Sequence, residues 1–494
     1  MNRGLIGVML GAMMTAFAAC GGGATPEPTP TRSATALPSP TVVDTAVAAS
    51  TVVPTPVAIS EPPAATSTEV VSIDFWTSDN EPKRMTVYRA LAERYQADHP
   101  NVQVNIVPFV ESTALQQLEQ AQAEGRLPDM IRVGIDWVLT LDGSGLLDTA
   151  AAQAVVDRIG ADDFREGVLP IVTDAATGRV LAVPYDGWMQ ALWYRRDHFE
   201  QLGLNRPISW AEINQACDVI EAGDEVAFAL VLPTVGSQTY VHQVFEQVAM
   251  SNNAWPFDAA GNVTMNTPEM VEALRFYAGL QRCSPSAPQD LYSARERYEV
   301  GESAMLFYST YIMDDLIDGS ERADGSKVEI AVENLPAKTS FTSSLAGPNG
   351  VASYGQLVTL ALLEGAAPET QDVARFFMQE GYIDILATAP LGKVPVLESA
   401  LDAWAVSSPV FEAYSPATLG HIANGFASMK RWVLRPEYSR AQKATIGAIE
   451  ARLIVPQAIE QLVAGDLTPE TAAQQLQTQV EELYRVRMAD VATP

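Results

Sequence analysis

The sequence predicts an α/β fold with two lobes, beginning near residue 70. From there, short segments typical of strands and helices alternate, a pattern that indicates a mostly parallel sheet flanked by helices. The stretch from residue 70 to the end is too long for one hydrophobic core of the usual size, so we expect two lobes. No internal repeat stands out that would favour a solenoid.

The first elements can be assigned from their periodicity. Residues 72–77 (SIDFWT) are typical of a strand, and residues 81–99 carry apolar side chains at helical spacing. Residues 102–110 alternate like a second strand. A helix at 114–125 and a strand at 129–136 (DMIRVGID) should follow, so that strands and helices alternate through the first lobe.

Helix starts are marked further along the chain. Ser209 precedes a helical stripe, with a glutamate at the third helical position. Thr267 and Thr468 are each followed by a proline, which is favoured at the first position of a helix. Residues 449–485 are expected to form one or two amphipathic helices, broken at Gly465.

The N-terminus predicts export. Residues 1–19 have the layout of a signal peptide, because Arg3 precedes an apolar run too short to span a membrane comfortably. The run ends at Cys20 in FAAC, which resembles a bacterial lipobox, where the peptide is cut before a cysteine that then carries lipid such as palmitate. An ordinary secretory signal with a chance cysteine is the alternative. Residues 20–69, rich in Pro, Thr, Ala and Ser, should be a disordered tether.

Two cysteines remain if Cys20 is lipidated. Cys217 and Cys283 could pair, as cysteines in an exported chain often do, and would then close a loop of about 66 residues. They could equally be two separate buried thiols.

The composition excludes several classes of function. The net charge of −29, from 60 acidic and 31 basic residues, argues against nucleic acid and against direct contact with anionic lipid. The four histidines are scattered, and no HExxH, CxxC, P-loop, GxGxxG or GxSxG motif occurs, so we expect no metal and no cofactor. Carboxylate pairs are common in so acidic a chain, and a glycosidase pair therefore stays open.

Seven segments together carry a family likeness. The chain resembles the bacterial extracellular solute-binding proteins of the maltose-binding type, which feed ABC importers, over about residues 70–485. The segments are FWTS (75–78), PDMIRVGID (128–136), GRVLAVPYDGWMQALWYRRDHFEQLGL (178–204), ISWAEI (208–213), GNVTMNTPEMVEALRFY (261–277), GESAMLFYSTY (301–311) and VPQAIEQLVAGDLTPETAAQQL (455–476).

The resemblance implies a type II periplasmic-binding-protein-like fold, in which two α/β lobes are joined by crossing segments and hold the ligand in a cleft. The crossings should fall within the aromatic stretch 182–199, near 350–356 and near 405–415. The lobes would then be built from residues 70–190 and 353–408 for the first, and 191–352 and 409–494 for the second.

The resemblance also implies a function. The protein should be a monomeric, lipid-anchored component on the outer face of the cell membrane that captures a carbohydrate and delivers it to an ABC permease, without catalysing a reaction. The alternatives are a surface glycoside hydrolase with a carboxylate pair, and a binder of peptide or another solute on the same fold.

The aromatic stretch 182–199 offers the first candidates for a site. Aromatic rings cover the apolar faces of sugar rings, and polar groups bind the hydroxyl rim. Trp193 and Tyr194 are interpreted as core residues of a strand, whereas Tyr185 and Trp188 should lie in the loop before it and could bind ligand. Asp186 is either a rim acceptor or a solvated loop acid.

Further candidates follow from strand ends and motif positions. Ligands bind at the carboxyl ends of strands in α/β folds, which favours Asp136 and Trp137, and also Trp76 and Asp79, although Trp76 could equally belong to the core. The other candidates for ligand binding, placed by the family motifs, are Tyr308, Tyr311, Tyr354, Arg435 and Tyr438.

Overall fold

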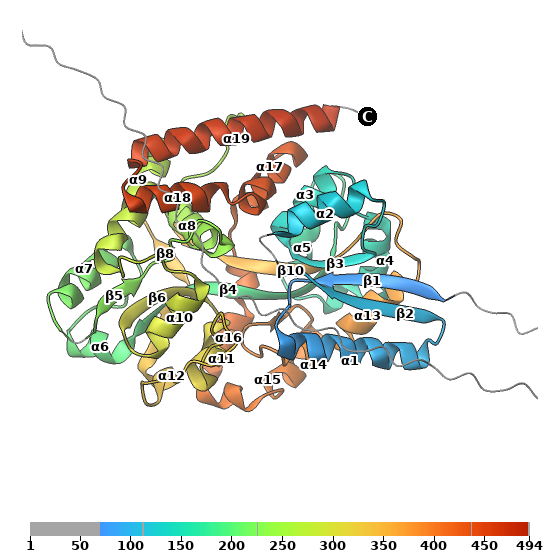
Figure 1. The fold of residues 1–494 in the computed structure, drawn as a ribbon, viewed down its shortest axis with the longest axis horizontal. Helices are drawn as coiled ribbons and strands as arrows, with labels where there is room; N and C mark the ends of the chain where they lie inside the picture. The colour runs from blue at the N-terminus through green and yellow to red at the C-terminus, as the bar shows by residue number, and fades with distance from the viewer. Residues whose placement is uncertain (1–69, 111–112, 225, 436, 493–494) are drawn as a thin grey trace, which may run out of the picture. The chain divides into compact units, whose positions relative to one another are not determined.

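The computed structural model describes residues 70–492, except 111–112, 225 and 436 (Figure 1). The expected signal peptide, Cys20 and the tether lie outside the described residues. Within the described part of the chain, no helix combines the length and apolar character that crossing a membrane requires.

Three parallel strands begin the first lobe, as the sequence predicts. β1 (Val71–Thr77) lies between β2 (Val102–Pro108) and β3 (Met130–Gly134). Phe75 of β1 is fully buried and meets Tyr88 of the first helix edge to face, with 5.7 Å between the ring centroids. The helices of this lobe are α1 (Pro82–Asp98), α2 (Ala114–Ala123), α3 (Ile135–Gly143), α4 (Thr149–Ile159), α5 (Val168–Val172), α13 (Thr370–Met378), α14 (Tyr382–Leu386) and α15 (Leu401–Ala405).

One long strand connects the lobes. β4 (Val183–Arg195) pairs with β10 (Gly355–Leu362) through its first seven residues and then with β6 (Ser303–Ser309) and β7 (Thr339–Thr342). The expected loop before Trp193 is therefore wrong, because Tyr185 and Trp188 already belong to the strand. The partner that orders them, β10, lies far along the sequence and leaves no local signal.

The sheet is mixed. Its strands follow the order β2-β1-β3-β10-β4-β6-β5, where β5 is Phe228–Val231, and the short β11 (Val394–Pro395) also pairs with β4. Pairing is parallel at the two ends of the sheet, and antiparallel where β4 and β10 run side by side through the middle (Figure 1). A separate pair, β8 (Ser344–Ala346) and β9 (Val351–Ser353), precedes β10.

Helices surround β5 and β6 in the second lobe. They begin with side-chain caps where the sequence predicts them, since Ser209 accepts the amide of Glu212 and Thr267 accepts the amide of Met270. Before Thr267, Val263 forms an isolated antiparallel bridge with Phe257, and residues 262–265 are not a strand. The helices are α6 (Arg196–Gln201), α7 (Trp210–Glu221), α8 (Thr239–Ser251), α9 (Pro268–Gly279), α10 (Leu291–Glu299), α11 (Ile312–Asp318) and α12 (Leu335–Lys338).

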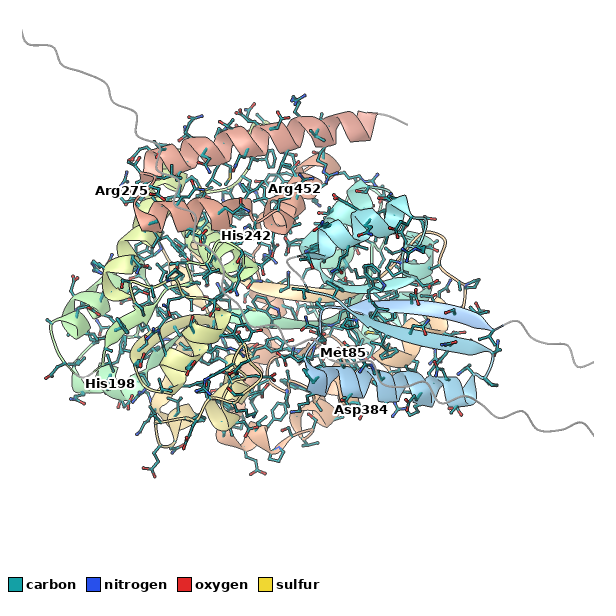
Figure 2. All side chains as sticks on the ribbon, in the orientation of Figure 1. Met85, His198, His242, Arg275, Asp384 and Arg452 are labelled. Carbon is teal, nitrogen blue, oxygen red and sulfur yellow. A yellow bond between two sulfur atoms is a disulfide. The ribbon has the colours of Figure 1, made fainter. Side chains whose placement is uncertain are left out.

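The C-terminal helices follow the predicted break. α18 (Ile454–Ala464) ends at Gly465, which has a left-handed backbone with φ of 84°, and Thr468 then caps α19 (Pro469–Ala492). α19 lies along α9, where the labelled Arg275 pairs with Glu470 (Figure 2).

The three crossings differ in form. The first is β4 itself, and the second is the step from β9 to β10, within the expected range. The third, expected near 405–415, extends further along the chain, because Tyr414 still contacts the second lobe at Met313 while Asn424 contacts the first lobe at Arg165. This seam contains η5 (Pro409–Ala413), α16 (Pro416–Ala423), η6 (Gly425–Ser428) and η7 (Trp432–Leu434).

After the seam, α17 (Arg440–Ala451) packs tightly on α3 of the first lobe. The close approach depends on Gly447, because a Cβ there would collide with the carbonyl oxygen of Asp136 and with the hydroxyl of Thr140. α17 also contacts α19 and α8, so it ties both lobes together.

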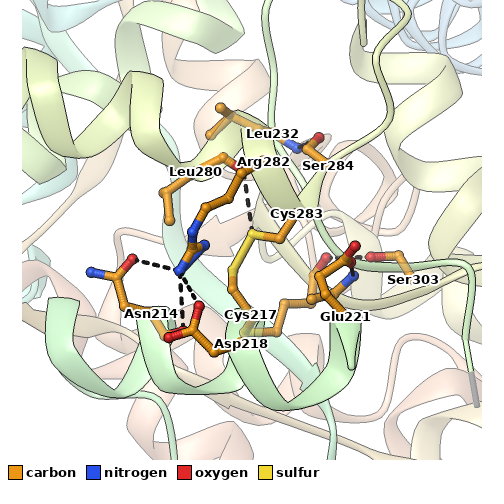
Figure 3. Close-up of a disulfide and its surroundings, with 12 residues drawn as sticks. Asn214, Cys217, Asp218, Glu221, Leu232, Leu280, Arg282, Cys283, Ser284 and Ser303 are labelled. Atoms are coloured by element: carbon orange, nitrogen blue, oxygen red, sulfur yellow. Dashed lines mark hydrogen bonds and ion pairs between the residues drawn. A yellow bond between two sulfur atoms is a disulfide. The ribbon is translucent and has the colours of Figure 1, made fainter. Parts of the chain in front are cut away.

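A disulfide joins Cys217 of α7 to Cys283, with 5.6 Å between the Cα atoms (Figure 3). The two cysteines are therefore paired and are not separate buried thiols. A closed loop of this length stabilises the fold by about 4 kcal/mol in the chain-entropy model. Arg282 adds an ion pair with Asp218 on α7, at 2.7 Å (Figure 3).

Candidate ligand-binding site

Two neighbouring cavities, which share Gln243, are lined by residues of both lobes. The larger has a volume of about 650 Å³, and we call it the tyrosine compartment. The smaller, of about 180 Å³, is called the arginine pocket. Together they are large enough to hold a small organic molecule.

The tyrosine compartment takes most of its wall from the second lobe. Tyr308 and Tyr240 meet edge to face with 5.3 Å between centroids, and the Tyr240 hydroxyl donates to the Phe307 carbonyl oxygen. The first lobe contributes Val110, which follows β2, to this wall. The remaining residues of the wall are Gln190, Ser237, Gln238, Thr239, Gln243, Leu291, Tyr292, Ser309 and Leu453.

The arginine pocket takes most of its wall from the first lobe. Trp188 of β4 and Gln356 of β10 stand opposite each other in the paired strands. Tyr311 and Gln243 reach it from the second lobe. The other lining residues are Ser78, Asp79, Arg84, Arg132, Gly134 and Val358, several of which lie at or near the carboxyl ends of β1 and β3.

Asp79 is the centre of a buried group of charges, the cleft network, formed with Arg84, Arg132, Lys393 and Asp186. The Asp79 carboxylate accepts from Arg84 Nη1 at 3.1 Å, from Tyr88 Oη at 3.0 Å and from Lys393 Nζ at 2.5 Å. Arg132 Nε lies 3.5 Å from the same carboxylate.

The electrostatics of Asp79 follow from these neighbours. Burial alone would raise the pKa of its carboxyl, but the positive charges of Arg132, Lys393 and Arg84 outweigh burial and hold the pKa well below its usual value. Burial and the charge of Arg132 lower the pKa of Lys393 to about 8. Asp79 is therefore a carboxylate at neutral pH, and Lys393 is mostly protonated.

Arg132 reaches across β10 to the next strand. Its Nη2 atom lies 2.7 Å from one oxygen of Asp186 and 3.1 Å from the other. Asp186 has no exposed surface and Arg132 is 4% exposed. Asp186 is thus the buried counter-ion of an arginine that lines the cavity.

A second buried group of charges, the hinge network, lies where the seam meets α3, α8 and α17. Arg431 contacts Asp136 at 2.7 Å, Glu246 at 3.0 Å and Glu450 at 3.3 Å. His242, labelled on α8 in Figure 2, lies 3.1 Å from Glu246.

The hinge network holds more acids than cations. Burial and the neighbouring Asp136 carboxylate raise the pKa of Glu450 well above its usual value. Burial also acts against the charged form of Glu246, but Arg431 and His242 lower its pKa nonetheless. The network therefore favours the protonated form of Glu450 and the ionised form of Glu246.

The two networks are linked by Gln356. Arg431 donates to Gln356 Oε1, and Gln356 Nε2 lies 3.3 Å from Asp136 Oδ2. The amide of Gln356 rests on Gly134, where any Cβ would collide with it. The seam thus fixes the orientation of a side chain that faces the arginine pocket.

Four of the residues that the sequence predicts for ligand binding line the cavities. Asp79, Trp188 and Tyr311 line the arginine pocket, and Tyr308 lines the tyrosine compartment. Whether they touch a ligand stays a prediction.

Five other candidates are buried away from both cavities. Asp136 and Trp137 do not end a strand but lie in the first turn of α3, where Asp136 is bound by Arg431. Tyr185 and Tyr354 are fully buried, and Asp186 is a buried counter-ion, neither a rim acceptor nor a solvated loop acid. These placements correct the expectation, because each side chain is covered by elements distant in sequence.

The last three candidates lie elsewhere. Trp76 is half-buried beside Phe109, with 6.5 Å between ring centroids, and lines neither cavity. Arg435 lies over the ring of Trp255, and Tyr438 borders a separate cavity of about 320 Å³ beside α17.

The residues that give the site its charge, Arg84, Arg132 and Lys393, were not predicted from the sequence. Arg132 did carry a signal, since it interrupts the apolar run of a buried strand, where an unpaired charge is costly. Gln243, Gln356 and Arg431 carry no such signal in the sequence. Among the described residues, no group of His, Cys, Asp and Glu side chains is arranged to hold a metal ion.

Known proteins share this architecture. Residues 78–355, more than half of the chain, match the family model "Bacterial extracellular solute-binding protein". The "Putative ABC transporter periplasmic-binding protein YcjN" of Escherichia coli (strain K12) is 29% identical over 308 residues, covering 62% of this chain and 68% of that protein.

Solved structures agree on the fold. T. maritima MalE3 with bound maltose superposes with a TM-score of 0.65 at 20% identity, over 84% of this chain and 100% of that chain. A sugar transporter of Arthrobacter chlorophenolicus A6 with bound laminaribiose gives 0.66 at 17% identity, over 83% and 99%. At these identities the likeness shows the fold alone, which is the two-lobed, type II periplasmic-binding-protein-like fold. With more than half of its length matched, the chain belongs to the bacterial extracellular solute-binding protein family.

Proposed function

We propose that this solute-binding protein captures a carbohydrate, a mono- or oligosaccharide, between its lobes and delivers it to the permease of an ABC importer. A lipid on Cys20 would hold it at the outer face of the cell membrane, with residues 21–69 as a tether. The observation that supports a carbohydrate best is the wall of the two cavities, where Trp188, Tyr308 and Tyr311 stand beside polar groups. Rings of this kind cover sugar faces, while amides and guanidinium groups bind hydroxyls.

Two further findings favour this proposal. Solved neighbours of the same fold hold maltose and laminaribiose. Both lobes also contribute residues to the walls of the cavities. A ligand there would contact both lobes only when they are close together, so it would bind that closed arrangement better than one with the lobes apart. A ligand shifts such an equilibrium only by this difference in affinity.

The hydrolase alternative is less well supported. A glycosidase needs a carboxylic acid whose pKa is raised, so that it can donate a proton. The acid that lines the arginine pocket, Asp79, has its pKa lowered by Arg132, Lys393 and Arg84 against the effect of burial. Asp314, whose pKa burial raises to about 7, does not line the arginine pocket but borders an adjoining cavity that shares Arg84 and Tyr311 with it.

A screen of thermal stability against neutral and acidic mono- and oligosaccharides tests the carbohydrate proposal. A bound sugar should raise the melting temperature, with saturable binding in calorimetry. The proposal fails if no sugar shifts the melting temperature while amino acids or peptides do.

Two tryptophans of β4 make that test specific to the site. Trp188→Ala removes a ring that faces the arginine pocket, and should weaken sugar binding about thirtyfold or more with little change in stability. Trp193 is 1% exposed and donates to the Tyr308 carbonyl oxygen at 2.9 Å, so Trp193→Ala should instead cost about 3–5 kcal/mol of stability. If Trp188→Ala unfolds the protein while Trp193→Ala only loses sugar binding, Trp188 is the core residue and Trp193 is the one in the site.

The anchor is tested separately. Cys20→Ala should release the protein into the medium or leave it unprocessed. If the variant fractionates with membranes and is cleaved like the wild type, Cys20 is not the anchor.

A further inference from the structure

Two arginines, Arg84 and Arg132, line the arginine pocket beside the buried carboxylate of Asp79. We propose that the sugar bound by this protein carries a single negative charge, the carboxylate of a uronic acid, and that this carboxylate binds in the arginine pocket to Arg84 and Arg132. The inference rests on the proposed carbohydrate function and narrows it to acidic sugars.

The carboxylate that lines the pocket is already occupied. Three donors, Arg84, Lys393 and the hydroxyl of Tyr88, hydrogen-bond to the Asp79 carboxylate, and Arg132 Nε lies 3.5 Å from it as an ion pair. A carboxylate has about four lone-pair sites, and these three hydrogen bonds occupy most of them, so Asp79 is a poor acceptor for the several hydroxyl groups of a neutral sugar. Its role is to hold the cations in place.

The other acid of the network is out of reach. Asp186 has no exposed surface, and both of its oxygens accept from Arg132 Nη2. A ligand in the pocket therefore meets the arginines and neither of their buried counter-ions as a free acceptor.

The cations that face the pocket keep donors for a ligand. Arg84 donates from Nη1 to Asp79, and its Nε lies 3.2 Å from Glu81 as an ion pair, which leaves Nη2 for a ligand. Arg132 uses Nη2 for Asp186, and its Nη1 makes only a long contact of 3.5 Å with Ser78.

Gln356 is also presented as a donor. Its oxygen is held by Arg431, and its Nε2 lies at the distance of a weak hydrogen bond, 3.3 Å, from Asp136. An amide fixed in this way cannot turn to offer its oxygen to a sugar hydroxyl, and it keeps an N–H for the ligand.

The charge balance agrees with the donor pattern. The cleft network contains three cations, Arg84, Arg132 and Lys393, and two buried acids, Asp79 and Asp186. Glu81 pairs with Arg84 as well, but it is 42% exposed, so water screens its charge. One positive charge is left over, in a protein whose net charge is −29. A ligand with one negative charge would compensate it.

A carboxylate fits this excess better than a phosphate. A phosphate monoester carries about −1.5 to −2 charges at pH 7, which would overcompensate the pocket beside two buried acids. A carboxylate carries one charge and can accept from two guanidinium groups through its two oxygens. The rest of the sugar would extend toward Trp188 and the tyrosine compartment.

Calorimetric titration of the wild-type protein tests the inference with matched sugars. The probes are galacturonate and galactose, glucuronate and glucose, digalacturonate, and the methyl ester of galacturonate, which has the same shape without the charge. We expect a uronate to bind about tenfold or more tightly than its neutral partner and than the ester. Its affinity should fall as salt is added.

Two arginines of α1 provide the matched variants. Arg84→Gln should reduce the preference for the uronate over the neutral sugar about tenfold, whereas Arg89→Gln removes the same charge from an exposed position of the same helix and should leave the preference unchanged. The melting temperature of each unliganded variant shows whether it is folded.

The outcomes separate the two proposals. If neutral sugars bind as tightly as uronates, or if the preference survives Arg84→Gln in a folded protein, the acidic-sugar inference is wrong while the carbohydrate function stands. Tighter binding of glucose 6-phosphate than of every uronate would also overturn it, in favour of a phosphorylated ligand. Binding of no sugar at all, neutral or acidic, would overturn both.

Discussion

The cleft network and the hinge network are both clusters of buried charge, but their balance is opposite. The cleft network has three cations and two buried acids, and it opens onto a cavity. The hinge network sets one arginine, Arg431, and one histidine among three acids, and its charged groups line none of the cavities described above.

The difference shows how the surroundings of a buried charge set its use. Excess positive charge beside a cavity can be balanced by a ligand. An excess of acid away from any cavity cannot be balanced by a ligand, and there burial and Asp136 raise the pKa of Glu450, which favours its protonated form. The first network is suited to binding, and the second to holding the lobes together.

The largest effect should come from Arg431→Met. The substitution leaves three acids buried without their guanidinium partner, and breaking a buried ion network in this way costs about 3–5 kcal/mol. Denaturant unfolding measures the loss. Arg158→Met, which breaks the half-exposed pair with Asp372, should cost about 1 kcal/mol or less. Equal losses would show that the buried hinge network stabilises the fold no more than an exposed ion pair does.

Asp79→Asn should be nearly as severe, by about 3 kcal/mol, because three cations lose their shared acid. The folded pKa of Asp79 lies below its usual 3.8, so the contribution of the carboxylate is present above pH 3.8 and is lost as the pH falls below it. The advantage of the wild type over the variant should therefore shrink in acid. A gap independent of pH, or an equal loss in exposed Asp372→Asn, would contradict this.

Gly447→Ala should have an intermediate effect, since it separates the α17 helix, which carries Glu450, from α3. The new Cβ collides with the carbonyl oxygen of Asp136, and overpacking of this kind costs about 1–3 kcal/mol. Gly420 of α16 has open space around it, so Gly420→Ala should be neutral or stabilising by up to about 1 kcal/mol. Thermal unfolding of the two variants side by side measures the contrast; equal effects would mean that α17 can shift freely.

The smallest effect is expected for Glu450→Gln, below about 1 kcal/mol, because the amide is neutral like the protonated acid that burial and Asp136 favour. The folded pKa of Glu450 lies above its usual 4.5, so its contribution is full below pH 4.5 and declines as the pH rises toward the folded value. As the pH rises, the wild type should therefore lose stability relative to Glu450→Gln. For Asp79→Asn the wild type should instead lose its advantage as the pH falls.

Glu246→Gln provides the control for that prediction. The pKa of Glu246 is lowered by Arg431 and His242 against the effect of burial, so the folded protein needs its charge, and the variant should be clearly less stable. If Glu246→Gln and Glu450→Gln behave alike, the proton does not reside on Glu450.

The sequence was most informative where structure depends on near neighbours. The strand at 72–77, the caps at Ser209, Thr267 and Thr468 and the break at Gly465 were all predicted. Each depends on contacts within a few residues, so a short window of sequence contains the needed information.

Prediction from the sequence failed where one face of a helix or strand is covered by a segment far away along the chain. Asp136 was expected at an open strand end, but α17 and Arg431 cover it, some 300 residues further along the chain. Tyr185 was expected in a loop, but β10 pairs with its strand, and its ring lies 5.9 Å from that of Tyr382. Burial by distant segments leaves no mark on local periodicity.

By itself, the sequence determined the family, the alternation of strands and helices, and a chain acidic enough to argue against nucleic acid. Only the tertiary structure decided which aromatic rings face the cavities, that Cys217 and Cys283 pair, and that cations lower the pKa of Asp79 while burial raises that of Glu450. The physical reason is that the charge state and accessibility of a side chain depend on every group packed around it, and folding brings those groups together from positions far apart along the chain.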